Sequence, residues 1–247
     1  MDRICVLLPA YNEAERIEAV IRGVRVPDAA VEVVVVDDGS FDETRRVAAR
    51  AGARVITLGR NLGVGAALAR GLALGRDEGF DYLVHIDADG QIDPAQIPAV
   101  LAPVREGRAD AAIGSRFLAG RPAYLTPLKS FLLSLLAGAV GVAVDAPLTD
   151  LSCGIRALNR AALAAARPRF GSDYIQETLL QFFGAGLRVV EVPVEARGRD
   201  GARGLSGRAL SYTTRYLFLL AWALGGFYVA RLRRLLSPAP APALAGR

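Results

Sequence analysis

Asp87 and Asp89 are two carboxylates at a spacing of two, and Asp93 follows them closely. They come directly after the apolar run of residues 82–86, so they leave the end of a predicted strand together. Carboxylates this close repel one another and favour a bound cation. Their oxygen atoms suit Mg²⁺ or Mn²⁺, which usually bind through one or two carboxylates and the phosphates of a substrate. The motif therefore indicates a metal-bridged nucleotide or, alternatively, an acidic turn that caps the helix predicted from Pro94.

Two other predicted strands also end in polar residues. The apolar run of residues 4–8 leads into Tyr11-Asn12-Glu13, and the run of residues 31–36 leads into Asp37-Asp38. Continuous runs rich in β-branched residues are typical of strands buried on both faces of a parallel sheet. Ligands of such sheets bind beyond the carboxyl ends of the strands. We therefore expect all three polar groups to share one edge of a sheet.

Strand and helix patterns alternate through the first half of the chain. Ser40 and Glu43 form a capping-box signature, which predicts a helix beginning near Phe41. The alternation predicts an α/β fold with a doubly wound, mostly parallel sheet flanked by helices. The predicted strands are residues 4–8, 31–36, 54–58, 82–86 and 109–113, and the predicted helices are residues 13–24, 41–51, 63–76 and 94–105.

Two apolar segments set the second half apart. Residues 130–144 carry no charge, and residues 209–230 carry only Arg215. As a helix, the second segment would extend about 33 Å, which is enough to cross a bilayer. Each segment is alternatively a buried core helix. We therefore divide the chain into a domain of residues 1–208, an apolar membrane-associated helix of residues 209–236 and a disordered tail of residues 237–247.

The net charge of +5 arises mainly near the C-terminal end. Between residues 197 and 234, arginines are frequent and Asp200 is the one acidic residue. Such a region suits nucleic acid, anionic lipid or a phosphorylated substrate. Nucleic acid is not expected as a partner, because it does not fit three acidic strand ends. The two cysteines, Cys5 and Cys153, form no disulfide framework and suit a reducing, cytosolic setting.

Five short motifs follow one another along the first half of the chain. They are Pro9-Ala10-Tyr11-Asn12-Glu13, Asp37-Asp38-Gly39-Ser40, Asn61-Leu62-Gly63-Val64-Gly65, Asp87-Ala88-Asp89-Gly90-Gln91 and Gly114-Ser115-Arg116-Phe117. In this order the chain resembles the GT-A glycosyltransferases of family two, in particular the enzymes of the dolichyl-phosphate mannose synthase type. The resemblance continues through residues 150–157 and Gln176-Glu177, and it covers about residues 1–210.

The resemblance implies a donor side that binds a nucleotide-diphosphate sugar and Mg²⁺ or Mn²⁺. Carboxylates also suit this role chemically, because ribose hydroxyls and base N–H groups are donors. The metal ligands implied are Asp89 and Gln91, whereas His85 is expected to be a packed core residue and Asp42 a helix cap. The nucleotide-binding residues implied are Pro9, Tyr11, Glu13, Asp38, Asp87 and Ala88.

The resemblance also implies an acceptor side that binds a polyprenyl phosphate. Arg116 and Lys129 are expected to contact the acceptor phosphate, together with the hydroxyl of Ser134. A loop that closes on the diphosphate is expected to contribute Arg203, Ser206 and Arg208, although Gly207 stands where relatives have a lysine. The residues expected to take part in catalysis are Asp89, Asp150, Arg116 and Glu177.

The implied reaction is an inverting transfer of a hexose to a polyprenyl phosphate. A phosphate monoester is largely ionised at neutral pH and needs no general base. A sugar hydroxyl does need one, and Asp150 and Glu177 are the candidates in that case. The alternatives are a saccharide or small-metabolite hydroxyl as acceptor, and a non-catalytic membrane protein that binds nucleotide sugars.

The apolar segments predict a position at the cytoplasmic face of a membrane, where nucleotide sugars are available. A single crossing by residues 209–230 would place Arg231, Arg233 and Arg234 outside, against the positive-inside tendency. We therefore expect the segment to lie in the membrane interface, with its arginines on anionic headgroups. Packing within a homo-oligomer is the other arrangement that avoids this conflict.

Overall fold

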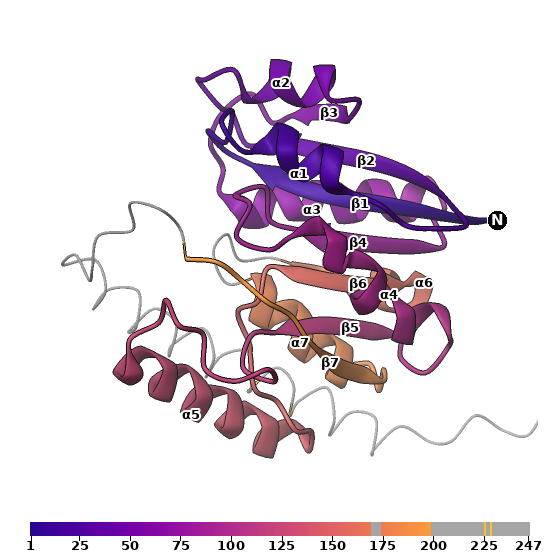
Figure 1. Cartoon of the computed structure of the whole chain (residues 1–247). Helices are drawn as coiled ribbons and strands as arrows, with labels where there is room; N and C mark the ends of the chain where they lie inside the picture. The colour runs from indigo at the N-terminus through magenta and orange to yellow at the C-terminus, as the bar shows by residue number, and fades with distance from the viewer. Residues whose placement is uncertain (169–173, 199–224, 226–227, 229–247) are drawn as a thin grey trace, which may run out of the picture.

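The computed structural model of the chain describes residues 1–168 and 174–198, together with residues 225 and 228 (Figure 1). Arg203, Ser206 and Arg208, the predicted helix of residues 209–236 and the predicted tail of residues 237–247 lie outside the described residues.

The described chain is built around a seven-stranded sheet in the order β3-β2-β1-β4-β6-β5-β7. All neighbouring strands run parallel except β6, which is antiparallel to both β4 and β5. This confirms the predicted α/β class with a mostly parallel sheet. The strands are β1 (Asp2–Ala10), β2 (Ala29–Asp37), β3 (Arg54–Thr57), β4 (Tyr82–Ile86), β5 (Ala111–Ser115), β6 (Ile155–Asn159) and β7 (Val189–Pro193).

Helices cover both faces of the sheet. They are α1 (Ile17–Gly23), α2 (Thr44–Arg50), α3 (Val64–Asp77), the 3₁₀ helix η1 (Pro94–Gln96), α4 (Ile97–Arg105), α5 (Pro127–Val144), α6 (Arg160–Ala165) and α7 (Tyr174–Gly184). Alternate residues of each strand serve the two faces. In β1, Ile4, Val6 and Leu8 pack with α1, α2 and α4. Cys5 and Leu7 pack on the other face with α3, α6 and α7.

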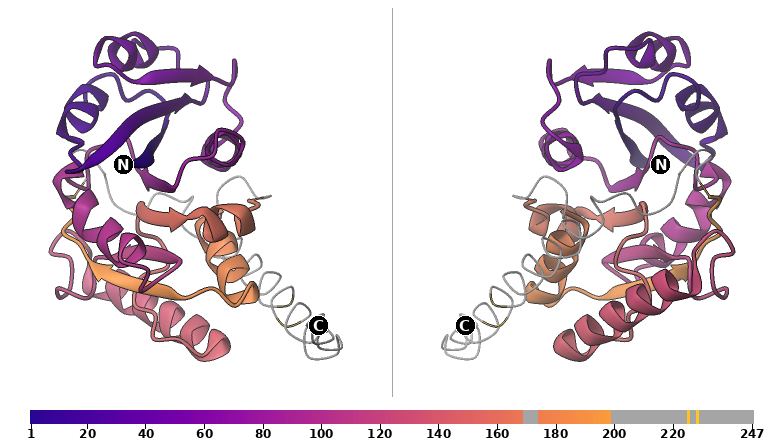
Figure 2. Two further views of the ribbon diagram at one scale, coloured as in Figure 1. Left: turned by 90° about the vertical axis from the view of Figure 1, so that its right-hand side faces the viewer. Right: turned by 90° about the vertical axis from the view of Figure 1, so that its left-hand side faces the viewer.

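A third apolar cluster lies at the β5–β7 end of the sheet, where α5 runs along the outside of the domain (Figures 1 and 2). Ala137, Val140 and Val144 of α5 pack against α7 and β5. The opposite face of α5 is exposed and apolar, with Leu128, Phe131, Leu132, Leu135 and Val142 open to solvent. The sequence left open whether residues 130–144 form a membrane-associated segment or a buried core helix. In the structure, α5 packs one face against the core and exposes the other.

The capping-box prediction at Ser40 is wrong. α2 begins at Thr44, and its first turn receives no capping hydrogen bond from the Ser40 side chain. The Ser40 hydroxyl instead accepts the backbone N–H of Asn12 at 2.9 Å. The carboxylate of Asp42 accepts the Thr44 backbone N–H at 2.9 Å, which confirms its expected capping role.

α1 is also shorter than predicted, because residues 14–16 form a turn before Ile17. Just before this turn the backbone N–H of Glu13 donates to the Thr44 hydroxyl at 2.8 Å, a bond that ties the start of α1 to the start of α2. β6, α6, α7 and β7 were not predicted from the sequence.

Gly71 gives a direct test of the packing between α3 and β1. A Cβ at this position would overlap the buried side chain of Leu7. We expect Gly71→Ala to lower the free energy of unfolding by about 1–3 kcal/mol, because overpacking forces a core side chain out of its rotamer. Urea denaturation measures this change.

Gly138→Ala is the matched control, because a Cβ at this helical position would meet nothing within 4 Å. It should raise stability by up to about 1 kcal/mol, the difference in helix propensity between alanine and glycine. A Gly71→Ala protein as stable as the parent would contradict the packing described.

Candidate active site

The three polar loops predicted from sequence do meet at one edge of the sheet. β1 ends at Ala10, which is the register partner of Asp37, the last residue of β2. β4 pairs with the other side of β1, so that Leu7 stands opposite His85 and β4 ends one residue later at Ile86. The loops after β1, β2 and β4 therefore start side by side.

The loop after β1 is hydrogen-bonded to the loop after β2. Asn12 has a left-handed backbone, with φ of 55°, and its side-chain oxygen accepts the backbone N–H of Phe41 at 3.1 Å. The ring of Phe41 meets that of Tyr11 edge to face, with 6.1 Å between centroids. Tyr11 and Phe41 are both exposed, so this part of the predicted nucleotide pocket presents aromatic surface to solvent.

Asp38, predicted to bind the nucleotide, is almost completely buried. Its two carboxylate oxygens accept the backbone N–H groups of Leu62 and Gly63 at 2.7 and 2.8 Å. Gly39 permits this approach, because a Cβ there would overlap the backbone of Arg60. Asp38 thus holds the loop before α3 in place, and a contact between Asp38 and a nucleotide stays a prediction.

The other predicted nucleotide residues differ in their exposure. Pro9, near the end of β1, and Ala88, in the turn that follows β4, are buried. Glu13 is also buried, and its carboxylate lies 3.3 Å from the guanidinium of Arg16.

Asp87 contacts His85 and Gly154, two residues outside the motif of residues 87–91. One of its carboxylate oxygens lies 3.2 Å from Nε2 of His85, the core histidine expected from sequence, which is buried. The other carboxylate oxygen occupies the place where a side chain of residue 154 would stand, so glycine is required there. The backbone N–H of Asp87 also donates to the carbonyl of Gly154 at 3.0 Å. The carboxylate keeps a side-chain exposure of 39% and can reach a ligand.

Asp89 and Gln91 face each other within the turn that follows β4. The backbone N–H of Gln91 donates to one carboxylate oxygen of Asp89 at 3.0 Å, and the side-chain amide of Gln91 donates to the other. Both side chains are partly exposed.

This donor set fits a divalent cation that is shared with a substrate. Within residues 1–168 and 174–198, no three His, Cys, Asp or Glu side chains cluster closely enough to enclose a metal ion. The turn instead offers the oxygens of Asp89 and Gln91, with Asp87 nearby. Mg²⁺ is commonly bound by one or two carboxylates and completed by substrate phosphates, which matches this arrangement.

Arg116, predicted to contact the acceptor phosphate, and Asp150, predicted to take part in catalysis, form a two-point ion pair with each other. Nε and Nη2 of Arg116 donate to the two carboxylate oxygens of Asp150 at 2.6 and 2.9 Å. The side chains are only 15% and 1% exposed. Burial lowers the pKa of the Arg116 guanidinium, but the hydrogen bonds and charge of Asp150 outweigh this, and the pKa is raised. Arg116 is therefore a fixed cation.

Glu191 and Ser152 complete this cluster and were missed from sequence. Glu191 accepts the backbone N–H groups of Thr149 and Asp150 at 2.8 and 2.9 Å, which fixes the loop that carries Asp150. The Ser152 hydroxyl accepts Nη2 of Arg116 at 2.6 Å. The signal for Glu191 was present in the sequence, since a single acid interrupts the apolar run of β7.

The remaining predicted residues lie on α5 and α7. Lys129 and Ser134 are exposed on α5. Glu177 is buried near the start of α7, where Arg156 of β6 donates to the carbonyl of Ile175 at 2.7 Å. β6 begins at the site edge of the sheet, because Ile155 pairs with Ile86, so this bond holds the start of α7 close to that edge.

Cys5 and Cys153 are buried free thiols. Burial is the main cause that raises the pKa of each to about 12, so both stay protonated near neutral pH and neither acts as a nucleophile.

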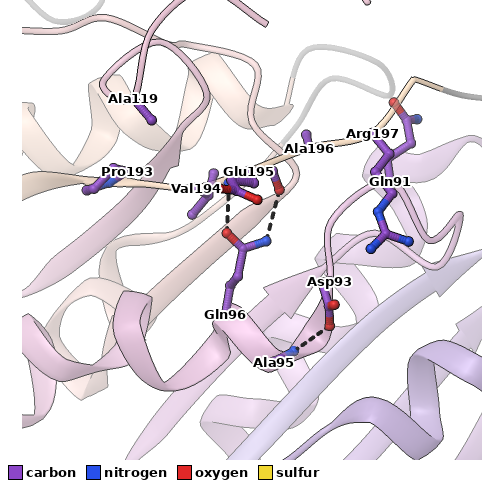
Figure 3. Close-up of a pocket in the computed structure, with 10 residues that line it drawn as sticks. All are labelled: Gln91, Asp93, Ala95, Gln96, Ala119, Pro193, Val194, Glu195, Ala196 and Arg197. Carbon is purple, nitrogen blue, oxygen red and sulfur yellow. Dashed lines mark hydrogen bonds between the residues drawn. The ribbon is translucent and has the colours of Figure 1, made fainter. Parts of the chain in front are cut away.

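A cavity of about 500 Å³ lies beside the turn that follows β4 (Figure 3). Gln91, Asp93 and Gln96 line one side of it. The segment that continues from β7, including Glu195 and Arg197, lines the other.

Comparisons with known proteins agree with this architecture. A family profile described as "Glycosyl transferase family 2" matches residues 5–165. The undecaprenyl-phosphate mannosyltransferase of Micrococcus luteus is 30% identical over 236 residues, which cover 89% of this chain and 96% of that protein. Glycosyltransferase AglD of Haloferax volcanii is 34% identical over 206 residues, which cover 78% of this chain. The match covers only 32% of AglD, so the chain spans about a third of that relative's length.

Among solved structures, the chain is similar to glucosyl-3-phosphoglycerate synthase from Mycobacterium tuberculosis. The TM-score is 0.71 at 26% identity, over 91% of this chain and 80% of that one. That crystal structure is a complex with Mn²⁺, uridine-diphosphate-glucose and phosphoglyceric acid.

Asp150→Asn tests the ion pair. Removing the charge of Asp150 leaves the buried Arg116 without its counter-ion, and breaking such a pair is expected to lower the free energy of unfolding by about 3 kcal/mol. Urea denaturation measures the loss. Glu18→Gln, in the exposed pair of Glu18 with Arg22, is the control and should cost less than about 1 kcal/mol. Equal effects of the two substitutions would contradict the buried pair.

Gly154→Ala tests the contact between Gly154 and the carboxylate of Asp87. The added methyl group must displace the Asp87 carboxylate, so we expect binding of Mn²⁺ together with UDP or GDP to weaken by about tenfold, the effect typical of disturbing a metal site's supporting groups. Calorimetric titration checks this, with Gly138→Ala as the control for a glycine-to-alanine change elsewhere. Unchanged affinity in Gly154→Ala would show that the position of Asp87 does not matter for binding.

Proposed function

The chain belongs to glycosyl transferase family 2, and from this premise we propose that it transfers a hexose from a nucleotide-diphosphate sugar to a polyprenyl phosphate. The observation that carries the proposal is the turn that follows β4. It presents Asp87, Asp89 and Gln91 at the carboxyl edge of the sheet, next to the loops that are predicted to bind a nucleotide. The acceptor class is supported by the undecaprenyl-phosphate relative, which the chain matches over almost its whole length.

Asp89 and Gln91 would hold Mg²⁺ or Mn²⁺, with Asp87 towards the nucleotide. When bound, the cation neutralises charge on the diphosphate as it leaves. The protein's own contribution on this side is rigidity, because His85 and Gly154 fix Asp87 and the loops after β1 and β2 are tied together. Preformed positions of this kind save the cost of ordering groups during the reaction.

The acceptor side supports displacement without a general base. A phosphate monoester has a second pKa near 6 and is already a nucleophile at neutral pH. Both oxygens of the Asp150 carboxylate are already engaged by Arg116. Arg116 supplies a fixed guanidinium beside the sheet edge, its charge balanced by Asp150, and Lys129 supplies an exposed basic side chain on α5. A direct attack at the anomeric carbon inverts its configuration.

The exposed face of α5 suits a lipid acceptor. Its five exposed apolar side chains lie on the same helix as Lys129. A row of exposed apolar residues beside a basic one is typical of helices that lie in a membrane interface. Within the described part of the chain, α5 is the one helix with the length and hydropathy to cross a membrane. Its packing with α7 and β5 makes it part of the domain core, which favours an interfacial position on the cytoplasmic face.

A second candidate acceptor is a small phosphorylated metabolite. It is favoured by the similarity to glucosyl-3-phosphoglycerate synthase, whose structure holds phosphoglyceric acid. In that case the nucleophile is a hydroxyl, which requires a base, and Asp150 and Glu177 are the candidates.

A donor screen separates these possibilities. The full chain is incubated with GDP-mannose, UDP-glucose or UDP-N-acetylglucosamine and Mn²⁺, with either a short polyprenyl phosphate or phosphoglyceric acid, and release of the nucleoside diphosphate is measured. We expect release with one donor to depend on Mn²⁺ and to rise with the polyprenyl phosphate alone. Stimulation by phosphoglyceric acid instead would establish the second candidate.

Asp89→Asn should reduce the stimulated rate by about 100-fold, the order of loss expected when one preorganised charge contact of a reaction site is removed. Asp77→Asn, an exposed position at the end of α3, is the control and should keep the parent rate. Full activity of Asp89→Asn would count against the proposed metal site.

A further inference from the structure

The segment that follows β7 lies against the turn that follows β4, although the two are about a hundred residues apart in sequence. The link is the side-chain amide of Gln96, the last residue of η1. Its Nε2 donates to the carbonyl of Glu195 at 2.9 Å, and its Oε1 accepts the backbone N–H of Glu195 at 2.7 Å (Figure 3). One glutamine therefore satisfies both backbone groups of one residue.

These two hydrogen bonds between Gln96 and Glu195, which we call the clasp, hold a short antiparallel pairing in register. Ile92 and Ala196 form a β-bridge, and the backbone N–H of Arg197 donates to the carbonyl of Gln91 at 2.8 Å. Ile92 and Val194 are buried in the core beneath the bridge. The pairing is very short, and a pair of strands this short needs support from outside itself. Gln96 supplies that support.

The pairing also fixes the backbone of Gln91. Its backbone N–H is bound by the Asp89 carboxylate at 3.0 Å, and its carbonyl is bound by Arg197. Both peptide groups of Gln91 are thus fixed, one from within the turn and one from the segment after β7. The fixed backbone determines where the Gln91 side chain meets Asp89.

We propose that Gln96 is a positioning residue for Gln91, and that the cation site is completed by the segment of residues 194–197 through this clasp. The proposal rests on the proposed function, since it concerns the same metal turn. Gln96 does not touch the cation and acts through Glu195, Ala196 and Arg197.

The test compares Gln96→Ala and Gln96→Glu with the parent in the full chain. Asn159→Ala is the matched control, because Asn159 also makes two side-chain hydrogen bonds, at the opposite edge of the sheet. Mn²⁺ binding in the presence of UDP or GDP is followed by electron paramagnetic resonance, and amide hydrogen exchange reports on the bond from Arg197 to Gln91. Thermal unfolding of all variants measures their stability.

We expect Gln96→Ala to bind Mn²⁺ about fivefold more weakly, the order set by one net hydrogen bond. Exchange at the Arg197 amide should become faster, whereas UDP or GDP binding without metal stays unchanged. Gln96→Glu keeps the acceptor for the Glu195 N–H but loses the donor, so it should fall between the parent and Gln96→Ala. Asn159→Ala should leave both Mn²⁺ binding and Arg197 exchange unchanged.

Three results would overturn the inference. Unchanged Arg197 exchange in Gln96→Ala would show that there is no clasp in solution. Faster exchange with unchanged Mn²⁺ affinity would show that the clasp does not position Gln91. Equal weakening of Mn²⁺ binding in Gln96→Ala and Asn159→Ala would indicate a global loss of stability. A parent protein that binds neither Mn²⁺ nor nucleotide would instead refute the proposed function, while the exchange data would still decide whether the clasp exists.

Discussion

Buried carboxylates must be hydrogen-bonded, and the loops around the site depend on how this chain meets that requirement. Asp38 is buried at the end of β2 and is satisfied by two backbone N–H groups of the loop before α3. Removing a charge from water is costly, so the partners are fixed once the carboxylate is buried. Each such acid converts a flexible loop into a defined surface.

The same constraint organises the cluster around Arg116. Asp150 is satisfied by Arg116, and Glu191 is satisfied by the backbone of the loop that carries Asp150. In the resulting cluster, Asp150 holds Arg116, and Glu191 holds the loop that carries Asp150. Such a cluster holds the guanidinium of Arg116 in one orientation. A preoriented guanidinium suits recognition of a phosphate by position and charge.

The strands that were predicted correctly are those with a continuous apolar pattern in the sequence. β1 and β2 are continuous apolar strands, so their positions were evident, and the acidic loops after them followed from the rule that parallel strands end at one edge. β6 was missed because Arg156 and Asn159 break up its apolar pattern, and β7 because Glu191 interrupts its pattern. The capping box failed because Asn12 takes the Ser40 hydroxyl, a contact between loops that no local pattern encodes. The pairing of Arg116 with Asp150 and the clasp at Gln96 are long-range contacts of the same kind.

The strand order also bears on how the chain acquires its fold during synthesis. β3, β2, β1 and β4 all come from the first 86 residues, so this half of the sheet can pair as soon as it emerges. β5 follows it along the chain but has no neighbour in the sheet until β6 arrives and inserts between β5 and β4. Until then β4 is an open edge of apolar residues, a state prone to pairing with other chains. Residues 155–159 therefore join the strands of the first 86 residues to β5, and they bring Gly154 to Asp87 at the same moment. Asp87, in the turn that follows β4, can thus reach its final position only once β6 has joined the sheet.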